Sequence, residues 1–246
     1  MNVDRWLPLP RPVGAVRLYC IPHAGGGASS FRPWLSALPG VAVSPVQLPG
    51  REARFREQAF QRMEPLIAEL TDVVMASADG PFAVYGHSVG ALIAFELVRE
   101  LRRREAAAPV HLFVSGSPAP EVLDEILPAD HEATDAEIVA LLRRLGGTPD
   151  SLLADPALLE LILPAVKADL TVRANYRYVP EAPLDLPLTL LAADHDPRAT
   201  VEGMDRWRDY TTGSFEQYNV GVGHFAVYEN AQVTHKYLGE ALRPWL

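Results

Sequence analysis

The chain has 246 residues, 48% of them hydrophobic and 22% charged, with a formal net charge of −9. That length suits one globular domain with a sizeable core, and the acidic balance argues against nonspecific nucleic-acid binding, which draws its affinity from Lys and Arg against phosphates. The single cysteine, Cys20, excludes an internal disulfide and a cysteine-based metal site.

The N-terminal segment and the apolar runs bear on cellular location. The first residues include Asp4 and Arg5 and lack the apolar stretch of a signal peptide. No run of about 18 apolar residues is present. We therefore expect a cytoplasmic protein with no membrane contact.

Apolar runs bounded by turn residues alternate with helical patterns along most of the chain. Strands are predicted at 16–21, 41–46, 82–85, 112–115, 188–193 and 215–220, and helices at 31–38, 63–76, 89–101, 201–210 and 230–242. Such alternation is typical of a mostly parallel sheet covered by helices on both faces. The predicted fold class is therefore α/β, with one domain spanning 1–246.

The segment 121–180 interrupts the alternation. It contains no convincing strand but has helical apolar patterns at 138–145 and 158–170. Because it lies between two predicted strands, we expect an inserted helical cap, or lid, that roofs the nucleophile described next. Ordinary helical packing is the alternative interpretation.

The pentapeptide Gly86-His87-Ser88-Val89-Gly90 joins a predicted strand to a predicted helix. A serine between two glycines in this context is the pattern of a nucleophile elbow, a tight turn that projects the serine hydroxyl outward. The small neighbours leave room for the helix to pack close to its strand. The sequence therefore predicts Ser88 as a catalytic nucleophile.

A serine hydroxyl needs a neighbouring base, and the base needs a carboxylate to hold its tautomer. His224 follows Gly223 in a loop after a predicted strand, and Asp196 lies in the loop after the strand at 188–193. The chain order Ser, Asp, His is the one that α/β-hydrolases use. Asp194 competes with Asp196, which we favour because its loop has left the strand and Pro197 stiffens it.

An oxyanion hole of backbone N–H groups would stabilise the negative charge that forms on the substrate oxygen. The expected donors are the amides of Val89, at the start of the helix, and Ala24, which precedes three glycines. This glycine run lacks the Lys and Ser/Thr of a Walker motif, and the chain has neither a dinucleotide fingerprint nor metal-ligand spacing. We expect no cofactor and no metal.

Several short motifs are more specific than the serine pentapeptide. They are Ile21-Pro22-His23-Ala24-Gly25-Gly26, Leu48-Pro49-Gly50-Arg51-Glu52, Gly86-His87-Ser88-Val89-Gly90-Ala91, Phe95-Glu96, Asp196-Pro197 and Gly223-His224-Phe225. Together, over nearly the whole chain, they resemble the type II thioesterases, stand-alone α/β-hydrolases that accompany polyketide synthases and nonribosomal peptide synthetases. The resemblance implies hydrolysis of acyl groups from the phosphopantetheine thiol of carrier proteins, which clears stalled or mis-primed synthases. It also implies Ser88, Asp196 and His224 as the triad, and the amides of Ala24 and Val89 as the oxyanion hole.

Carrier proteins tend to be acidic, so an acidic enzyme would meet them through a local basic patch. Arg51 and Arg54 cluster with Arg56 after the second predicted strand, and 102–104 is a second arginine cluster. Either is a candidate docking surface, with solvated arginines or an ion pair between Arg51 and Glu52 as the alternatives. The expected partners are carrier-protein domains and small acyl thioesters, and the protein is expected to be a monomer.

Three other functions share these residues. A medium-chain fatty acyl thioesterase differs in cap and pocket, and a small-molecule carboxylesterase shares every triad residue. A non-catalytic binding module on a hydrolase scaffold would be expected to lack a triad residue, and none is missing.

Overall fold

A six-stranded sheet organises the computed structural model, which describes residues 2–10, 13–123 and 133–246. All five neighbouring strand pairs are parallel, in the order β2-β1-β3-β4-β5-β6. The strands are β1 (Val16–Ile21), β2 (Val41–Pro45), β3 (Phe82–His87), β4 (His111–Ser115), β5 (Leu188–Asp194) and β6 (Phe215–Val222). The predicted strands and the predicted parallel sheet are confirmed.

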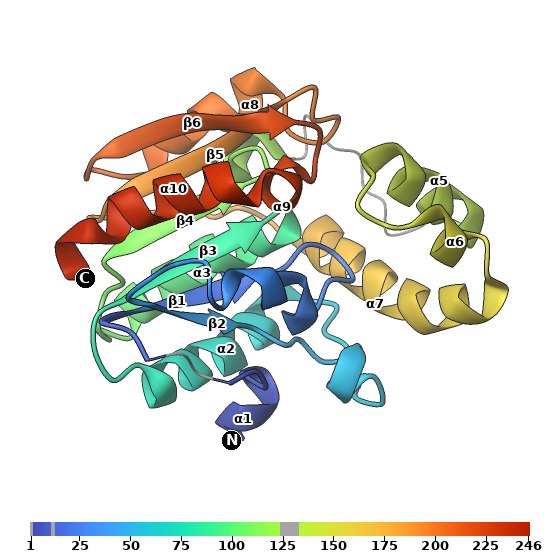
Figure 1. Ribbon diagram of the computed structural model, residues 1–246, viewed down its shortest axis with the longest axis horizontal. Helices are drawn as coiled ribbons and strands as arrows, with labels where there is room; N and C mark the ends of the chain where they lie inside the picture. Colours follow the sequence, from blue (N-terminus) through green and yellow to red (C-terminus); the bar gives the residue numbers. More distant parts are fainter. Residues whose placement is uncertain (1, 11–12, 124–132) are drawn as a thin grey trace.

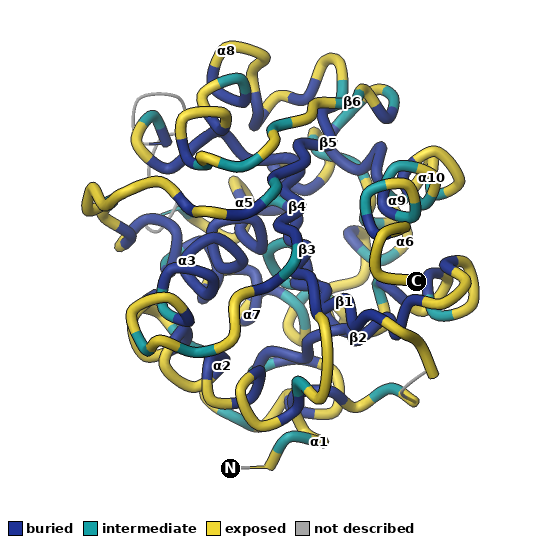
Figure 2. The backbone as a smooth tube through the Cα atoms, turned by 90° about the vertical axis from the view of Figure 1, so that its left-hand side faces the viewer, coloured by how far each residue is buried: buried dark blue, intermediate teal, exposed yellow. Residues whose placement is uncertain are grey.

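Helices cover both faces of this sheet. Figure 2 shows α2 (Met63–Ser77) and α3 (Val89–Arg103) on one side, with α9 (Ala226–Glu229) and α10 (Ala231–Leu242) on the other. Further short elements among the described residues are α1 (Val3–Trp6), α8 (Val201–Asp205) and five 3-10 helices: η1 (Ala28–Trp34), η2 (Glu52–Arg54), η3 (Pro120–Val122), η4 (Arg206–Tyr210) and η5 (Arg243–Trp245). Helices on two faces of a parallel sheet are the arrangement of the α/β-hydrolase fold, as predicted.

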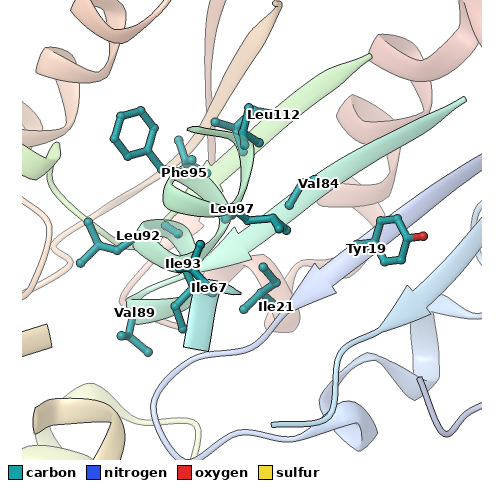
Figure 3. Packing of buried hydrophobic residues seen from close by; sticks show 14 of the residues in the cluster. Tyr19, Ile21, Ile67, Val84, Val89, Leu92, Ile93, Phe95, Leu97 and Leu112 are labelled. Carbon is teal, nitrogen blue, oxygen red and sulfur yellow. The ribbon is translucent and has the colours of Figure 1, made fainter. Parts of the chain in front are cut away.

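Two apolar clusters, one on each face, hold the sheet between its helices. In β1, Tyr19 and Ile21 belong to the cluster with α2 and α3, whereas Leu18 and Cys20 belong to the cluster with η1 and α10. Figure 3 shows the first cluster from close by. Successive strand residues point to opposite faces, so a strand buried on both faces must be apolar throughout.

Two predicted helices differ from the structure. The helix expected at 31–38 is the 3-10 helix η1, which contains Pro33. Proline has no N–H to donate and disfavours α geometry in the residue before it, so a regular α-helix is not favoured here. The helix expected at 201–210 divides into α8 and η4.

In the described part of the chain between β4 and β5, three α-helices lie to one side of the sheet (Figure 1). They are α5 (Asp135–Leu145), α6 (Asp150–Leu153) and α7 (Pro156–Asn175). Asp155 caps the N-terminus of α7, because its side chain accepts hydrogen bonds from the N–H groups of Ala157 and Leu158. The three helices share an apolar cluster of their own. Part of the predicted cap, 124–132, lies outside the described residues.

Crossing a bilayer requires a helix of sufficient length and apolarity. Within the described ranges, no helix combines enough of both.

Candidate active site

Ser88 occupies a strained turn between β3 and α3. Its backbone has φ 59° and ψ −123°, a conformation that residues with a side chain rarely adopt. The Ser88 N–H donates to the carbonyl oxygen of Ser115 at the end of β4, with N and O 2.8 Å apart. The turn is therefore fastened to the neighbouring strand, and the sheet supplies the support that the strain requires.

The glycines on either side of the turn are required by space. A Cβ at Gly86 would lie 2.0 Å from the carbonyl oxygen of Gly90, and a Cβ at Gly90 would lie 2.4 Å from that of Ile21. Both distances are far inside van der Waals contact. The start of α3 can sit against β1 and β3 only because neither residue has a side chain.

His224 connects the serine to a carboxylate. Its Nε2 lies 3.1 Å from Ser88 Oγ, and its Nδ1 lies 2.9 and 2.8 Å from the two carboxylate oxygens of Asp196. The side chains of His224 and Asp196 are each about 1% exposed. This geometry leaves Nε2 as the nitrogen that can take a proton from the serine hydroxyl.

The structure distinguishes the two candidate aspartates. Asp196 is buried, and its Oδ1 also accepts the N–H of Arg198, with N and O 2.8 Å apart. Asp194 is exposed, and its carbonyl oxygen accepts the N–H of Gly223 at 2.7 Å. Asp194 therefore fastens the loop that carries His224 through its backbone, while the Asp196 side chain contacts the imidazole.

The two expected oxyanion donors both lie near Ser88. Val89 is the first residue of α3, a position whose N–H has no acceptor within the helix. Ala24 lies in the loop after β1 and lines the same cavity as Ser88 and His224. In that loop the Gly26 N–H donates to the His23 carbonyl oxygen at 2.9 Å, which closes a tight turn around Ala24.

Two further histidines lie beside the triad and are neutral. Burial and, to a smaller extent, the nearby His224 and Arg51 lower the pKa of His23 to about 3. Burial likewise lowers the pKa of His87 well below its usual value, and its Nδ1 lies 2.9 Å from Ser115 Oγ. Neither residue therefore adds a positive charge that would oppose protonation of His224.

A cavity of about 730 Å³ opens above Ser88 and His224. One wall is the loop after β1, and the other comes from the helices between β4 and β5. The apolar residues that α5, α6 and α7 contribute to this second wall are Leu141, Leu142, Leu145, Leu152, Leu161, Ile162, Ala165, Val166 and Leu170. The cavity therefore offers an apolar surface next to a nucleophile, which suits a substrate with an aliphatic chain.

The predicted docking surface at Arg51 and Arg54 is corrected by the structure. Both residues are buried, with exposed fractions of 6% and 7%. Arg54 makes two hydrogen bonds to Glu57 and one to the carbonyl oxygen of Gln47, and its guanidinium lies 4.5 Å from the ring centroid of Trp6. Such enclosed guanidinium groups cannot meet another protein.

Arg51 instead pairs inside the protein, and the partner was not foreseen. Its guanidinium binds the carboxylate of Asp169 in α7, 118 positions along the chain. Glu52, the expected alternative partner, instead accepts hydrogen bonds from the N–H and the hydroxyl of Ser29. Asp169 stands within the predicted apolar pattern at 158–170 and is 4% exposed. An acidic residue in such a pattern was the available signal, because a buried carboxylate requires a partner; Glu160, in the same segment, is exposed.

Among the residues that the structure describes, no group of three or more His, Cys, Asp or Glu side chains is placed to hold a metal ion.

The chain matches a known protein family. The thioesterase domain family matches residues 16–238. The thioesterase PikA5 of Streptomyces venezuelae is 39% identical over 235 residues, which cover 92% of this chain and 82% of that protein.

Solved structures agree with the match. The RedJ thioesterase from the prodiginine biosynthetic pathway of Streptomyces coelicolor superimposes with a TM-score of 0.87 at 39% identity, covering 98% of this chain and 100% of RedJ. The type II thioesterase BorB from the borrelidin biosynthetic cluster also gives a TM-score of 0.87, at 33% identity, covering 99% of this chain and 100% of BorB.

Proposed function

The chain belongs to the thioesterase domain family, and we propose that it is a serine thioesterase that releases acyl groups from the phosphopantetheine arm of acyl or peptidyl carrier proteins. It serves as a type II thioesterase, removing aberrant or stalled intermediates in polyketide or nonribosomal peptide biosynthesis. The similarity to PikA5, RedJ and BorB over nearly the whole chain supports this assignment.

One observation carries the proposed chemistry. The side chains of Ser88, His224 and Asp196 form one series of hydrogen bonds, and it opens into an apolar cavity. A hydroxyl, a base and a carboxylate in this order are the groups that covalent acyl transfer requires. Helices α5 to α7 act as the cap of a single domain.

In the first half of the reaction, Ser88 Oγ attacks the thioester carbonyl carbon while His224 Nε2 takes the hydroxyl proton. Asp196 holds the Nδ1 proton and stabilises the imidazolium. The negative charge on the carbonyl oxygen accepts hydrogen bonds from the amides of Ala24 and Val89. The intermediate then collapses, the carbon–sulfur bond breaks, and the sulfur leaves as the pantetheine thiol, taking the proton from His224.

In the second half, water attacks the ester carbon on Ser88, and His224 removes a proton from that water. The second tetrahedral intermediate expels Ser88 Oγ, which recovers its proton from His224. The products are a free carboxylic acid and the unmodified enzyme. A thiolate is a better leaving group than an alkoxide, so the leaving step needs only modest acid assistance.

The test compares three substrates that share one octanoyl group: an octanoyl carrier protein, octanoyl-N-acetylcysteamine and p-nitrophenyl octanoate. We expect the wild-type enzyme to hydrolyse both thioesters and to show the highest kcat/KM with the carrier protein. Ser88→Ala should lower kcat by at least about 10⁴-fold, because the nucleophile is lost.

The carboxylesterase and the binding module each have their own outcome in this experiment. Turnover of the oxoester alone would indicate a carboxylesterase and contradict the proposal. Equal kcat/KM for the carrier protein and the small thioester would show that the enzyme does not recognise the carrier protein, and would contradict that part of the proposal. No turnover of any substrate, in folded wild-type protein that resists fluorophosphonate, would indicate a binding module.

A further inference from the structure

The loop after β1 is in direct contact with the cap helix α7. Gly25 has φ +74°, and a Cβ at this position would lie 2.4 Å from Cγ2 of Val166. The loop can pass beneath α7 only because Gly25 lacks a side chain. The residue before Gly25 is Ala24, whose amide is one of the two proposed oxyanion donors.

The same face of α7 also holds the loop through a hydrogen bond. Asp169, three residues after Val166 and therefore on the same side of the helix, accepts the N–H of Gly25 through Oδ2, with N and O 2.8 Å apart. The Asp169 side chain is about 5% exposed. A buried carboxylate is a strong acceptor for a backbone N–H, because little water competes with the donor.

Arg51 contacts both Asp169 and the glycine loop. Its Nη2 donates to Asp169 Oδ1 at 2.9 Å, and its Nη1 donates to the carbonyl oxygen of Gly26 at 3.3 Å. Its Nε donates to the carbonyl oxygen of Pro49 at 3.2 Å, which anchors the guanidinium to its own loop. The ion pair therefore makes two hydrogen bonds to the glycine loop, one with the Gly25 N–H and one with the Gly26 carbonyl oxygen.

These contacts reach the oxyanion donor through the peptide planes of the loop. The Ala24 N–H lies in the same peptide plane as the His23 carbonyl, which accepts the Gly26 N–H at 2.9 Å. Asp169 restrains the next plane, between Ala24 and Gly25, and Arg51 restrains the one after Gly26. Fixing this plane and the planes that follow it leaves the Ala24 N–H little freedom to turn away from the substrate oxygen.

We propose that Asp169 is a positioning residue, which acts with Arg51 to hold the Ala24 amide in the oxyanion hole. This inference rests on the proposed function of the site and adds to it a role for the cap. Helix α7 then does more than line the acyl cavity, because its docked position is a condition for efficient stabilisation of the transition state.

The test uses Asp169→Asn, with Asp135→Asn as the matched control. Asp135 pairs with Lys167 of α7 on the exposed side of the cap, so the control removes a carboxylate from a cap ion pair without touching the loop. Three quantities are measured: kcat and KM for octanoyl-N-acetylcysteamine, and the affinity for octylboronic acid, which adds to Ser88 Oγ as a tetrahedral anion.

We expect Asp169→Asn to lower kcat by about 10- to 100-fold, because misplacing one donor costs a large part of its contribution. KM should stay within about twofold, and the affinity for octylboronic acid should fall in parallel with kcat, as an interaction made mainly in the transition state requires. Asp135→Asn should leave all three quantities within about twofold. A loss confined to KM, an unchanged boronate affinity, or an equal loss in Asp135→Asn would overturn the proposal.

A second variant covers the case in which an unpaired Arg51 unfolds the protein. The double substitution Arg51→Met with Asp169→Leu removes both charges, a replacement that buried ion pairs often tolerate without loss of stability. It should remain folded and still show the lowered kcat and boronate affinity, because the Gly25 N–H has lost its acceptor. Wild-type kcat in this variant would contradict the positioning role.

Failure of the proposed function would be recognised separately. Boronate binding to the wild-type enzyme, measured by calorimetry, requires no turnover. An enzyme that binds octylboronic acid but hydrolyses no thioester would refute the thioesterase proposal. The role of Asp169 would then be decided by the boronate affinities of the variants.

Discussion

At the scale of single residues, Asp194 and Asp196 show how two neighbouring carboxylates acquire different roles. Asp194 is the last residue of β5 and its side chain faces solvent, whereas Asp196 is buried against His224. His195 between them has φ 55°, so the chain turns sharply at this point. The turn directs the Asp196 side chain toward the loop after β6.

We predict that Asp196→Asn lowers kcat for octanoyl-N-acetylcysteamine by about 10³- to 10⁴-fold, because an amide cannot stabilise the imidazolium and favours the wrong tautomer. Asp194→Asn should stay within about threefold of the wild-type enzyme, since its backbone contact to Gly223 survives. Steady-state kinetics on both purified variants checks the pair. The opposite order would assign the acid of the triad to Asp194.

At the scale of elements, the close approach of α3 to the sheet is the feature that places Ser88. The helix begins at Val89, and Gly90 lies against the carbonyl oxygens of Ile21 and Pro22 at the end of β1. Gly239 in α10 provides a contrast, because a Cβ there would meet no atom within 4 Å. Glycine is thus required by packing in α3, whereas in α10 it only weakens the helix.

We expect Gly90→Ala to lower the free energy of unfolding by about 3 kcal/mol or more, since the added methyl must displace backbone atoms. Gly239→Ala should raise it by about 0.5 to 1 kcal/mol, because alanine restricts the unfolded chain and favours the helix. Urea denaturation followed by circular dichroism measures both changes. Wild-type stability in Gly90→Ala would show that α3 does not pack as closely as described.

At the scale of the whole molecule, the cavity lies between the sheet with its loops and the helices α5 to α7. Ile162 of α7 is half-buried and lines this cavity. Leu158, one turn earlier in the same helix, is 40% exposed and lies outside the cavity lining. The length of acyl chain that the enzyme accepts should therefore depend on Ile162 and not on Leu158.

We predict that Ile162→Trp lowers kcat/KM for decanoyl-N-acetylcysteamine by about 10-fold or more while leaving the acetyl thioester within about threefold. The indole would occupy space that several methylenes of the long chain need, and each buried methylene is worth about 0.8 kcal/mol. Leu158→Trp serves as the control and should change neither substrate. An equal loss for both chain lengths would indicate general damage to the site.

The roles of the arginines also depend on the whole fold. Arg51 and Arg54 read as a basic surface in the sequence but are buried against carboxylates and carbonyl oxygens. Arg102 and Arg103, in the second cluster, remain 37% and 40% exposed and pair with Glu181. Burial depends on what the rest of the chain covers, and local charge spacing carries no information about that.

The sequence by itself determined the strands, the main helices and the placement of Ser88. Strand and helix periodicity are local properties, and a serine between Gly86 and Gly90 at a strand-to-helix turn has few structural solutions. The loop after β6 identified His224 for the same reason. These features depend on neighbours within about ten residues, so a linear pattern is enough to reveal them.

Only the tertiary structure decided which carboxylate contacts His224, which one pairs with Arg51, and which arginines are enclosed. Asp196 meets His224 across 28 positions, and Asp169 meets Arg51 across 118. Such pairings follow from how loops turn and how α7 docks on the glycine loop. A long-range contact is a property of the packed fold, because its free energy depends on burial and geometry that no local pattern specifies.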